Sequence, residues 1–75
     1  MAERMLDTRG LSCPLPVLKA RKALSGMAAG ERLRLLASDP KAVQDIAALC
    51  EGTGHRLLEA STDGPDLVFL LERHG

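Results

Sequence analysis

The sequence has few aromatic residues and no excess of charge of either sign. Among its 75 residues Phe69 is the one aromatic side chain, and both Trp and Tyr are missing. Proteins that bind single-stranded nucleic acid usually present several aromatic stacking platforms, which this chain does not have. Ten Lys and Arg balance ten Asp and Glu, so there is also no basic surplus for direct binding to nucleic acid or to an anionic membrane.

Long hydrophobic runs and clusters of cysteine are absent too. The longest aliphatic and aromatic run, residues 67–71, is far too short to span a bilayer, and residues 1–4 contain no apolar signal core. Cys13 and Cys50 lie far apart, without the cysteine density of a secreted disulfide scaffold. We therefore expect a soluble protein of a reducing, cytoplasmic compartment that has no contact with membranes.

The two histidines give no sign of a metal or cofactor site. His55 and His74 have no cysteines or carboxylates at metal-ligand spacing, so we expect neither a metal nor another cofactor. Both also lie in the C-terminal half of the chain, which argues against a hydrolase with a paired Cys and His.

The spacing of hydrophobic residues predicts a single domain, residues 1–75, with the element order β-α-β-α-β-β. Strands are expected at 4–9, 31–38, 55–62 and 66–73, and helices at 14–27 and from Pro40 to the glycine stop at Gly52. For so short a chain the economical arrangement is an α+β fold. It is a two-layer α/β sandwich in which two helices cover one face of a four-stranded mixed sheet.

Apolar positions at helical spacing define the expected inner face of each helix. In the first helix these positions are Val17, Ala20, Leu24 and Met27, and in the second they are Val43, Ile46, Ala47 and Cys50. Asp39 is expected to be the N-cap of the second helix, with Pro40 at the first helical position, where a missing N–H is no loss. On this stripe Cys50 is expected to be a buried core thiol.

The most distinctive run is Cys13-Pro14-Leu15-Pro16, at the start of the first helix. As N-cap, Cys13 would place its sulfur at the positive end of the helix dipole, which favours the reactive thiolate. Pro14 favours the extended conformation that an N-cap needs, and both prolines lack an N–H. The alternative is that Cys13 is an incidental small cap. We predict a rigidly presented, exposed thiol first, and a lowered pKa second.

The stretch from Leu6 to Val17, together with Lys19 and Arg21-Lys22, closely resembles the TusA/SirA family of small sulfur carriers. These proteins carry a Cys-Pro-x-Pro signature after an opening strand. The resemblance covers nearly the whole chain, through Gly30-Glu31, Asp39-Pro40, Asp45-Ile46, Cys50 and Thr62-Asp63-Gly64. It implies the two-layer fold described above.

The resemblance also implies a function. Cys13 is expected to carry sulfane sulfur as a persulfide, and Pro14 and Pro16 to fix its presentation. The expected partners are a cysteine desulfurase or rhodanese-like donor and a downstream acceptor protein. Family pathways include tRNA thiolation, molybdenum cofactor metabolism and sulfur oxidation. Such a chain is a carrier in sulfurtransferase relays rather than an enzyme with its own turnover.

Partner docking is predicted for residues around the thiol. Lys19, Arg21 and Lys22 follow Cys13 by one to two helical turns and suit either a solvated face or a docking patch for an acidic partner. Arg9 adds positive charge on the other side of the motif. Leu15 occupies a position that is often polar or acidic in the family, so we expect an exposed apolar contact there that affects partner choice.

Two other functions stay open from the sequence. One is a thiol redox enzyme that uses Cys13 with Cys50 as the resolving cysteine. The other is a non-catalytic regulatory binding module in which the thiol is idle. Away from the motif, Asp39 is expected to be a helix cap rather than a site residue. Asp45 is expected to be a solvated helix residue, with docking as its lesser alternative.

Overall fold

The computed structural model describes residues 3–75. Its elements are β1 (Glu3–Asp7), α1 (Leu15–Ser25), β2 (Arg32–Ala37), α2 (Ala42–Thr53), β3 (Arg56–Asp63) and β4 (Asp66–Glu72). The predicted element order is confirmed. The predicted start of the second helix at Pro40 is wrong, because Pro40 lies in the turn that precedes α2.

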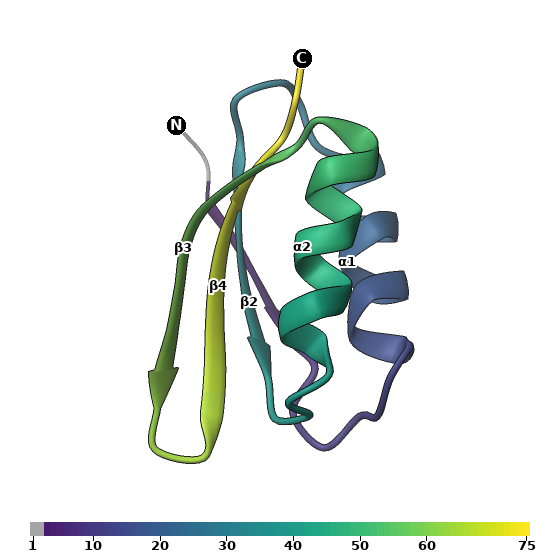
Figure 1. Cartoon of the computed structure of the whole chain (residues 1–75). Coiled ribbons are helices and arrows are strands. Elements are labelled where there is room, and N and C mark those ends of the chain that lie inside the picture. Colours follow the sequence, from purple (N-terminus) through teal and green to yellow (C-terminus); the bar gives the residue numbers. More distant parts are fainter. Residues whose placement is uncertain (1–2) are drawn as a thin grey trace.

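The sheet has the strand order β1-β2-β4-β3. β1 pairs with β2 in parallel, whereas β4 pairs antiparallel with both β2 and β3. Both helices cover the same face of this mixed sheet, as predicted (Figure 1). Because β1 and β2 are parallel and each is followed by a helix, the N-terminal ends of α1 and α2 lie at the same end of the sheet. The β1–α1 loop, which contains Cys13, therefore lies beside the β2–α2 loop.

The core lies between the sheet and the helices. Strand β2 alternates as predicted, with Leu33, Leu35 and Ala37 fully buried and the residues between them partly exposed. Phe69 at the centre of β4 is 1% exposed and pairs with Leu35. The helices contribute further buried side chains, namely Ala20, Leu24, Ala42, Ile46, Leu49 and Cys50. Met27 is buried as well, but it lies beyond the end of α1, so the predicted extension of the first helix to residue 27 is wrong.

The inner face of α2 differs from the predicted stripe. Val43 is 48% exposed and Ala47 is exposed, whereas Ala42 and Leu49 are buried. The buried series thus starts at Ala42 and continues through Ile46 to Leu49. Ala42 and Val43 both fit an apolar helical pattern, but the smaller Ala42 is the one that packs under the start of the helix.

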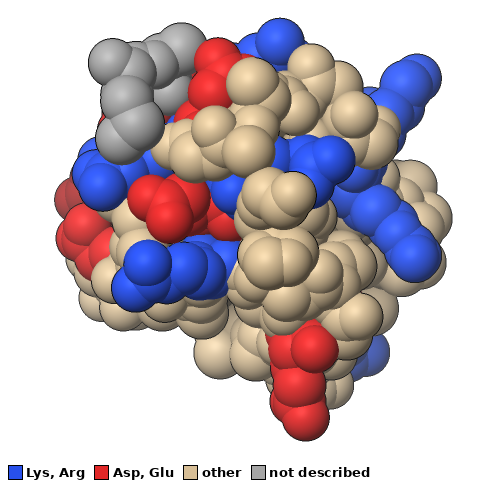
Figure 2. Space-filling model, turned by 90° about the horizontal axis from the view of Figure 1, so that it is seen from above, with Lys and Arg blue, Asp and Glu red and all other residues tan. Residues whose placement is uncertain are grey.

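Charge is mixed at the end of the molecule opposite the Cys13 loop. In the view onto that end, acidic and basic side chains alternate with uncharged ones, and neither sign covers the surface (Figure 2). Within residues 3–75, neither helix is long and apolar enough to cross a membrane.

Candidate functional site around Cys13

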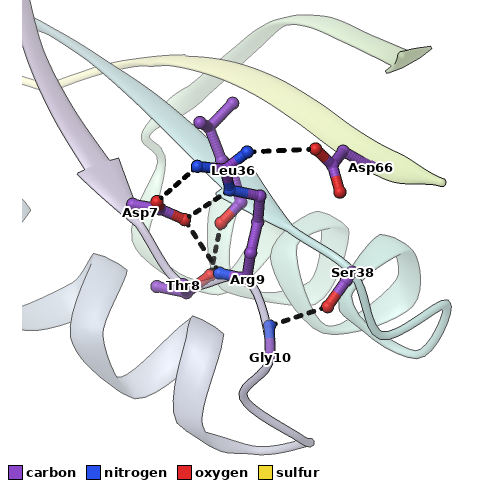
Figure 3. A network of polar contacts seen from close by, with 7 residues as sticks. All are labelled: Asp7, Thr8, Arg9, Gly10, Leu36, Ser38 and Asp66. Atoms are coloured by element: carbon purple, nitrogen blue, oxygen red, sulfur yellow. Dashed lines mark hydrogen bonds and ion pairs between the residues drawn. The ribbon is translucent and has the colours of Figure 1, made fainter. Parts of the chain in front are cut away.

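A polar network fixes the chain where it leaves β1 (Figure 3). The buried Thr8 donates twice to the Leu36 carbonyl oxygen on β2, from its N–H at 2.8 Å and from its hydroxyl at 2.5 Å. The Gly10 N–H donates to Ser38 Oγ at 2.8 Å. The start of the Cys13 loop is therefore attached to the end of β2 and to the residue that follows it.

Arg9 joins three segments within the same network. Its Nε and Nη2 donate to the two carboxylate oxygens of Asp7 at 2.9 and 2.8 Å, and its Nη1 donates to Asp66 Oδ2 at 3.3 Å. The hydrogen bonds from the Arg9 side chain and from its backbone N–H lower the pKa of Asp7 to about 2. Because two carboxylates already engage Arg9, less of its positive charge is available to Cys13 or to a partner. A docking role for Arg9 stays a prediction.

The start of α1 corrects the predicted cap. The helix begins at Leu15 and its N-cap is Pro14, whose carbonyl oxygen accepts the Leu18 N–H at 3.1 Å. The Leu15 N–H, the donor expected for the Cys13 side chain, instead donates to the Ser12 carbonyl oxygen at 2.9 Å. Cys13 therefore precedes the cap by one residue, and the prediction that it caps α1 is wrong. The Cys13–Pro14 peptide bond is cis.

Two aspartates contact Cys13, Asp39 from the β2–α2 loop and Asp45 from α2. The Cys13 N–H donates to Asp39 Oδ2 at 2.8 Å, and Cys13 Sγ donates to Asp45 Oδ2, also at 2.8 Å. Asp39 Oδ1 accepts the Lys41 N–H at 3.0 Å. The Asp39 carboxylate thus links the Cys13 loop to the turn before α2, while the Asp45 carboxylate contacts the Cys13 sulfur directly.

Both aspartates differ from their predicted roles. The N-cap of α2 is Lys41 rather than Asp39. Asp39 stabilises the turn before the helix, where its carbonyl oxygen accepts the Ala42 N–H at 2.9 Å, and it is a site residue as well. Asp45, expected to be solvated, is half-buried against the thiol. Sequence spacing around the motif gave no sign of these contacts, which depend on the parallel arrangement of β1 and β2.

The electrostatic environment raises the pKa of the Cys13 thiol. The largest cause is the hydrogen bond to Asp45, followed by partial burial and the negative charges of Asp45 and Asp39, with Lys41 acting in the opposite direction. The prediction of a lowered pKa for Cys13 is therefore wrong. The two backbone N–H groups that donate to Asp39 lower the pKa of that carboxyl.

The basic residues of α1 divide between two surface grooves. The helix–helix groove has a volume of about 320 Å³ and lies between α1 and α2, lined by Val17, Leu18, Arg21, Asp45, Ala48 and Leu49 among others. The helix–strand groove has a volume of about 360 Å³ and lies between α1 and β1, lined by Arg4, Leu6, Lys19, Lys22, Ala23 and Gly26. The structure therefore does not bring Lys19, Arg21 and Lys22 into one patch.

Exposed apolar side chains extend along α1 next to the thiol. Leu15 is 42% exposed, as expected, and Leu18, one turn later, is 50% exposed. Pro16 is buried and Pro14 is exposed. The two prolines therefore differ in environment, since Pro16 packs into the protein and Pro14 lies at the surface beside Cys13.

Cys50 and the histidines lie away from the thiol. Cys50 is a buried free thiol in the core, as predicted, and its burial raises its pKa. The His74 N–H donates to His55 Nδ1 at 2.9 Å, near the C-terminal end of α2. Among the described residues, no group of His, Cys, Asp and Glu has the geometry to hold a metal ion.

Comparison with known proteins identifies the family. The family model described as Sulfurtransferase TusA matches residues 4–73. This chain belongs to the TusA family. The TusA-family match includes all six elements, from within β1 to just beyond the end of β4.

Individual TusA relatives agree with this assignment. The chain is 39% identical over 71 residues to the sulfur carrier protein TusA of Allochromatium vinosum, covering 95% of this chain and 93% of the relative. A relative from Neisseria meningitidis serogroup A is 49% identical over the same coverage. The crystal structure of a SirA-like protein from Desulfitobacterium hafniense superposes with a TM-score of 0.83 at 26% identity, covering 95% of this chain and 97% of that one.

Proposed function

We propose that this TusA-family protein is a sulfur carrier that receives sulfane sulfur on Cys13 as a persulfide and passes it to an acceptor protein. The observation that carries the proposal is the setting of Cys13, a partly exposed free thiol in a loop that hydrogen bonds attach to the neighbouring β2–α2 loop. The relative from A. vinosum is named as a sulfur carrier, which supports the same role here.

Sulfur transfer at Cys13 needs an accessible sulfur more than it needs a dedicated base. In loading, the Cys13 thiolate bonds to the outer sulfur of a donor persulfide, the donor S–S bond breaks, and the donor cysteine leaves as a thiolate. In unloading, an acceptor thiolate attacks the outer sulfur on Cys13 in the same way. Pro14 is the N-cap of α1, and Pro16 is buried within the first turn of that helix. Together the two prolines fix the direction in which the chain presents the thiol.

The partners in this proposal are proteins on both sides of the relay. The donor is a cysteine desulfurase or a rhodanese-like protein, and the acceptor belongs to tRNA thiolation, molybdenum cofactor metabolism or sulfur oxidation. Leu15 offers partners an apolar contact beside the sulfur. Charged contacts to partners come from Arg21 on one side of α1, from Lys19 and Lys22 on the other side, and from Arg9. A carrier with an unpaired thiol suits a reducing cytoplasm, and we propose that residues 1–75 act there as one domain.

Intact mass measurement tests the carrier role. The protein is incubated with a cysteine desulfurase and cysteine, and we expect a gain of one sulfur that disappears in Cys13→Ala. No gain by the unaltered protein, or a gain that survives in Cys13→Ala, contradicts the proposal. Cys50→Ser is the matched variant, because it removes the other thiol and is expected to leave loading intact.

The position of Cys50 does not favour a thiol redox enzyme. Cys50 follows Asp45 by five positions on α2, about 7.5 Å along the helix axis, and points about 140° away from it around the helix. Since Asp45 contacts the Cys13 sulfur and Cys50 is buried in the core further along α2, we infer that the two sulfurs are not placed to form a disulfide. Mild peroxide is therefore expected to give no intramolecular disulfide, and non-reducing peptide mapping checks this.

A further inference from the structure

We propose that Asp45 restrains the carrier: its carboxylate holds Cys13 as a neutral thiol and so slows both the uptake and the loss of sulfur with small, adventitious thiols and persulfides. This inference rests on the proposed function, because it concerns the persulfide cycle of Cys13. It is carried by the hydrogen bond from Cys13 Sγ to Asp45 Oδ2 at 2.8 Å.

The charged groups around the sulfur favour the neutral form. Asp45 lies on α2 and contacts Sγ, while Asp39 and Lys41 act on it from the β2–α2 loop. Two carboxylates therefore oppose one ammonium group, and Lys41 is exposed to solvent, which screens its charge. α1 has no acidic residue in its first turn. Asp45 itself lies in the first turn of α2, where the helix dipole favours a negative charge.

The same charge distribution affects both directions of transfer. During loading the Cys13 proton passes to solvent, Sγ bonds to the outer sulfur of the donor, and the donor thiolate that leaves takes up a proton. During unloading Cys13 Sγ is itself the leaving thiolate, and it takes up a proton in turn. Sulfane sulfur moves without net oxidation or reduction. Because the Cys13 thiolate attacks in one direction and leaves in the other, a carboxylate beside it slows both.

Alkylation of the sulfur-free protein tests the restraint without any sulfur chemistry. The rate of iodoacetamide addition is measured from neutral to alkaline pH in a Cys50→Ser background, in which Cys13 is the one thiol. We expect Asp45→Asn to react about threefold faster at neutral pH, because more thiolate is present although each thiolate is a weaker nucleophile. In the alkaline range, where both proteins are ionised, the unaltered Asp45 protein should react faster, so the two profiles cross.

The crossing distinguishes an electrostatic role from a structural one. Simple loosening of the loop would raise the rate at every pH, whereas loss of the Asp45 charge raises it at neutral pH and lowers it at alkaline pH. Glu51→Gln is the matched control, since it removes a carboxylate from the exposed face of the same helix and should leave the profile unchanged. Asp45→Ser, a second neutral variant, should reproduce the Asp45→Asn profile.

Release of sulfur provides the second readout. Protein loaded chemically with sodium polysulfide is treated with dithiothreitol at neutral pH, and the loss of the added sulfur is followed by intact mass. We expect release from Asp45→Asn to be about threefold faster, because a thiolate of lower pKa leaves more readily. Profiles for Asp45→Asn that coincide with those of the unaltered protein, or an equal effect of Glu51→Gln, overturn the restraint.

The two proposals fail in different experiments. If the unaltered protein takes up no sulfur from a desulfurase while the alkylation profiles still cross, the carrier role is contradicted and the effect of Asp45 on the thiol is supported. If loading succeeds and the profiles coincide, the carrier role is supported and the restraint is contradicted.

Discussion

The backbone N–H of Cys13 donates to the carboxylate of Asp39 at 2.8 Å, although the two residues are 26 positions apart. The same carboxylate accepts the N–H of Lys41 at the start of α2. The position of the reactive sulfur is therefore set by the loop after β2 as much as by the helix that Cys13 precedes.

Removing the Asp39 carboxylate should release Cys13 from the β2–α2 loop. In Asp39→Ala both N–H groups lose their acceptor, so we expect a lower Tm and faster hydrogen exchange at the Cys13 amide. Asp39→Asn keeps one side-chain acceptor and should give an intermediate effect. Hydrogen exchange followed by NMR measures both, and an unchanged Cys13 exchange rate in Asp39→Ala would contradict the bridging role.

Thr8 should contribute to stability through its hydroxyl. Thr8→Val removes the hydrogen bond to the Leu36 carbonyl oxygen while keeping a similar shape, and we expect the free energy of unfolding to fall by about 1 kcal/mol. Thr62 is an exposed threonine on β3, so Thr62→Val serves as the control and should change stability little. Urea denaturation measures both variants, and equal effects would argue against a particular role for Thr8.

The raised pKa of Cys13 should make the fold less stable in alkaline solution. The folded protein holds the thiol proton more tightly than the unfolded chain, so this stabilisation is fully present below the ordinary thiol pKa. It is lost as pH rises through the folded value. Cys13→Ser should show a smaller alkaline loss of Tm than the unaltered protein. Thermal unfolding monitored by circular dichroism from neutral to alkaline pH measures the difference, and parallel curves would contradict it.

The two grooves should contribute unequally to donor binding. A partner that reaches Cys13 must approach Asp45, which lines the helix–helix groove together with Arg21. We therefore expect Arg21→Glu to weaken binding of a cysteine desulfurase roughly three- to tenfold. The double variant Lys19→Glu, Lys22→Glu changes the helix–strand groove and should have a smaller effect. Calorimetric titration at two salt concentrations measures both, and the reverse order would place docking on the other side of α1.

Much of the fold could be predicted because local patterns agree with the final packing. The alternation of Leu33, Leu35 and Ala37 gives the inner face of β2, and the turn formers Gly64 and Pro65 connect the last two strands. The α2 stripe was partly wrong because Ala42 and Val43 both fit an apolar helical pattern, and the tertiary packing decides between them.

The site was less predictable than the fold. The motif identified Cys13 as the residue of interest, but its pKa depends on Asp45, which is 32 positions away. Local reasoning gave weight to the dipole of the adjoining helix, whereas the structure shows a carboxylate in direct contact with the sulfur. That contact arises from parallel pairing of β1 and β2, which places the starts of both helices together.

The order of synthesis gives the bridging loops a further consequence. Cys13 emerges from the ribosome before Asp39 and Asp45 do, so the nascent chain first exposes this thiol without either carboxylate near it. A partly synthesised chain therefore carries a more readily ionised cysteine than the finished protein. Release of the C-terminal strands completes the sheet and, with it, the fold that keeps both carboxylates beside the thiol.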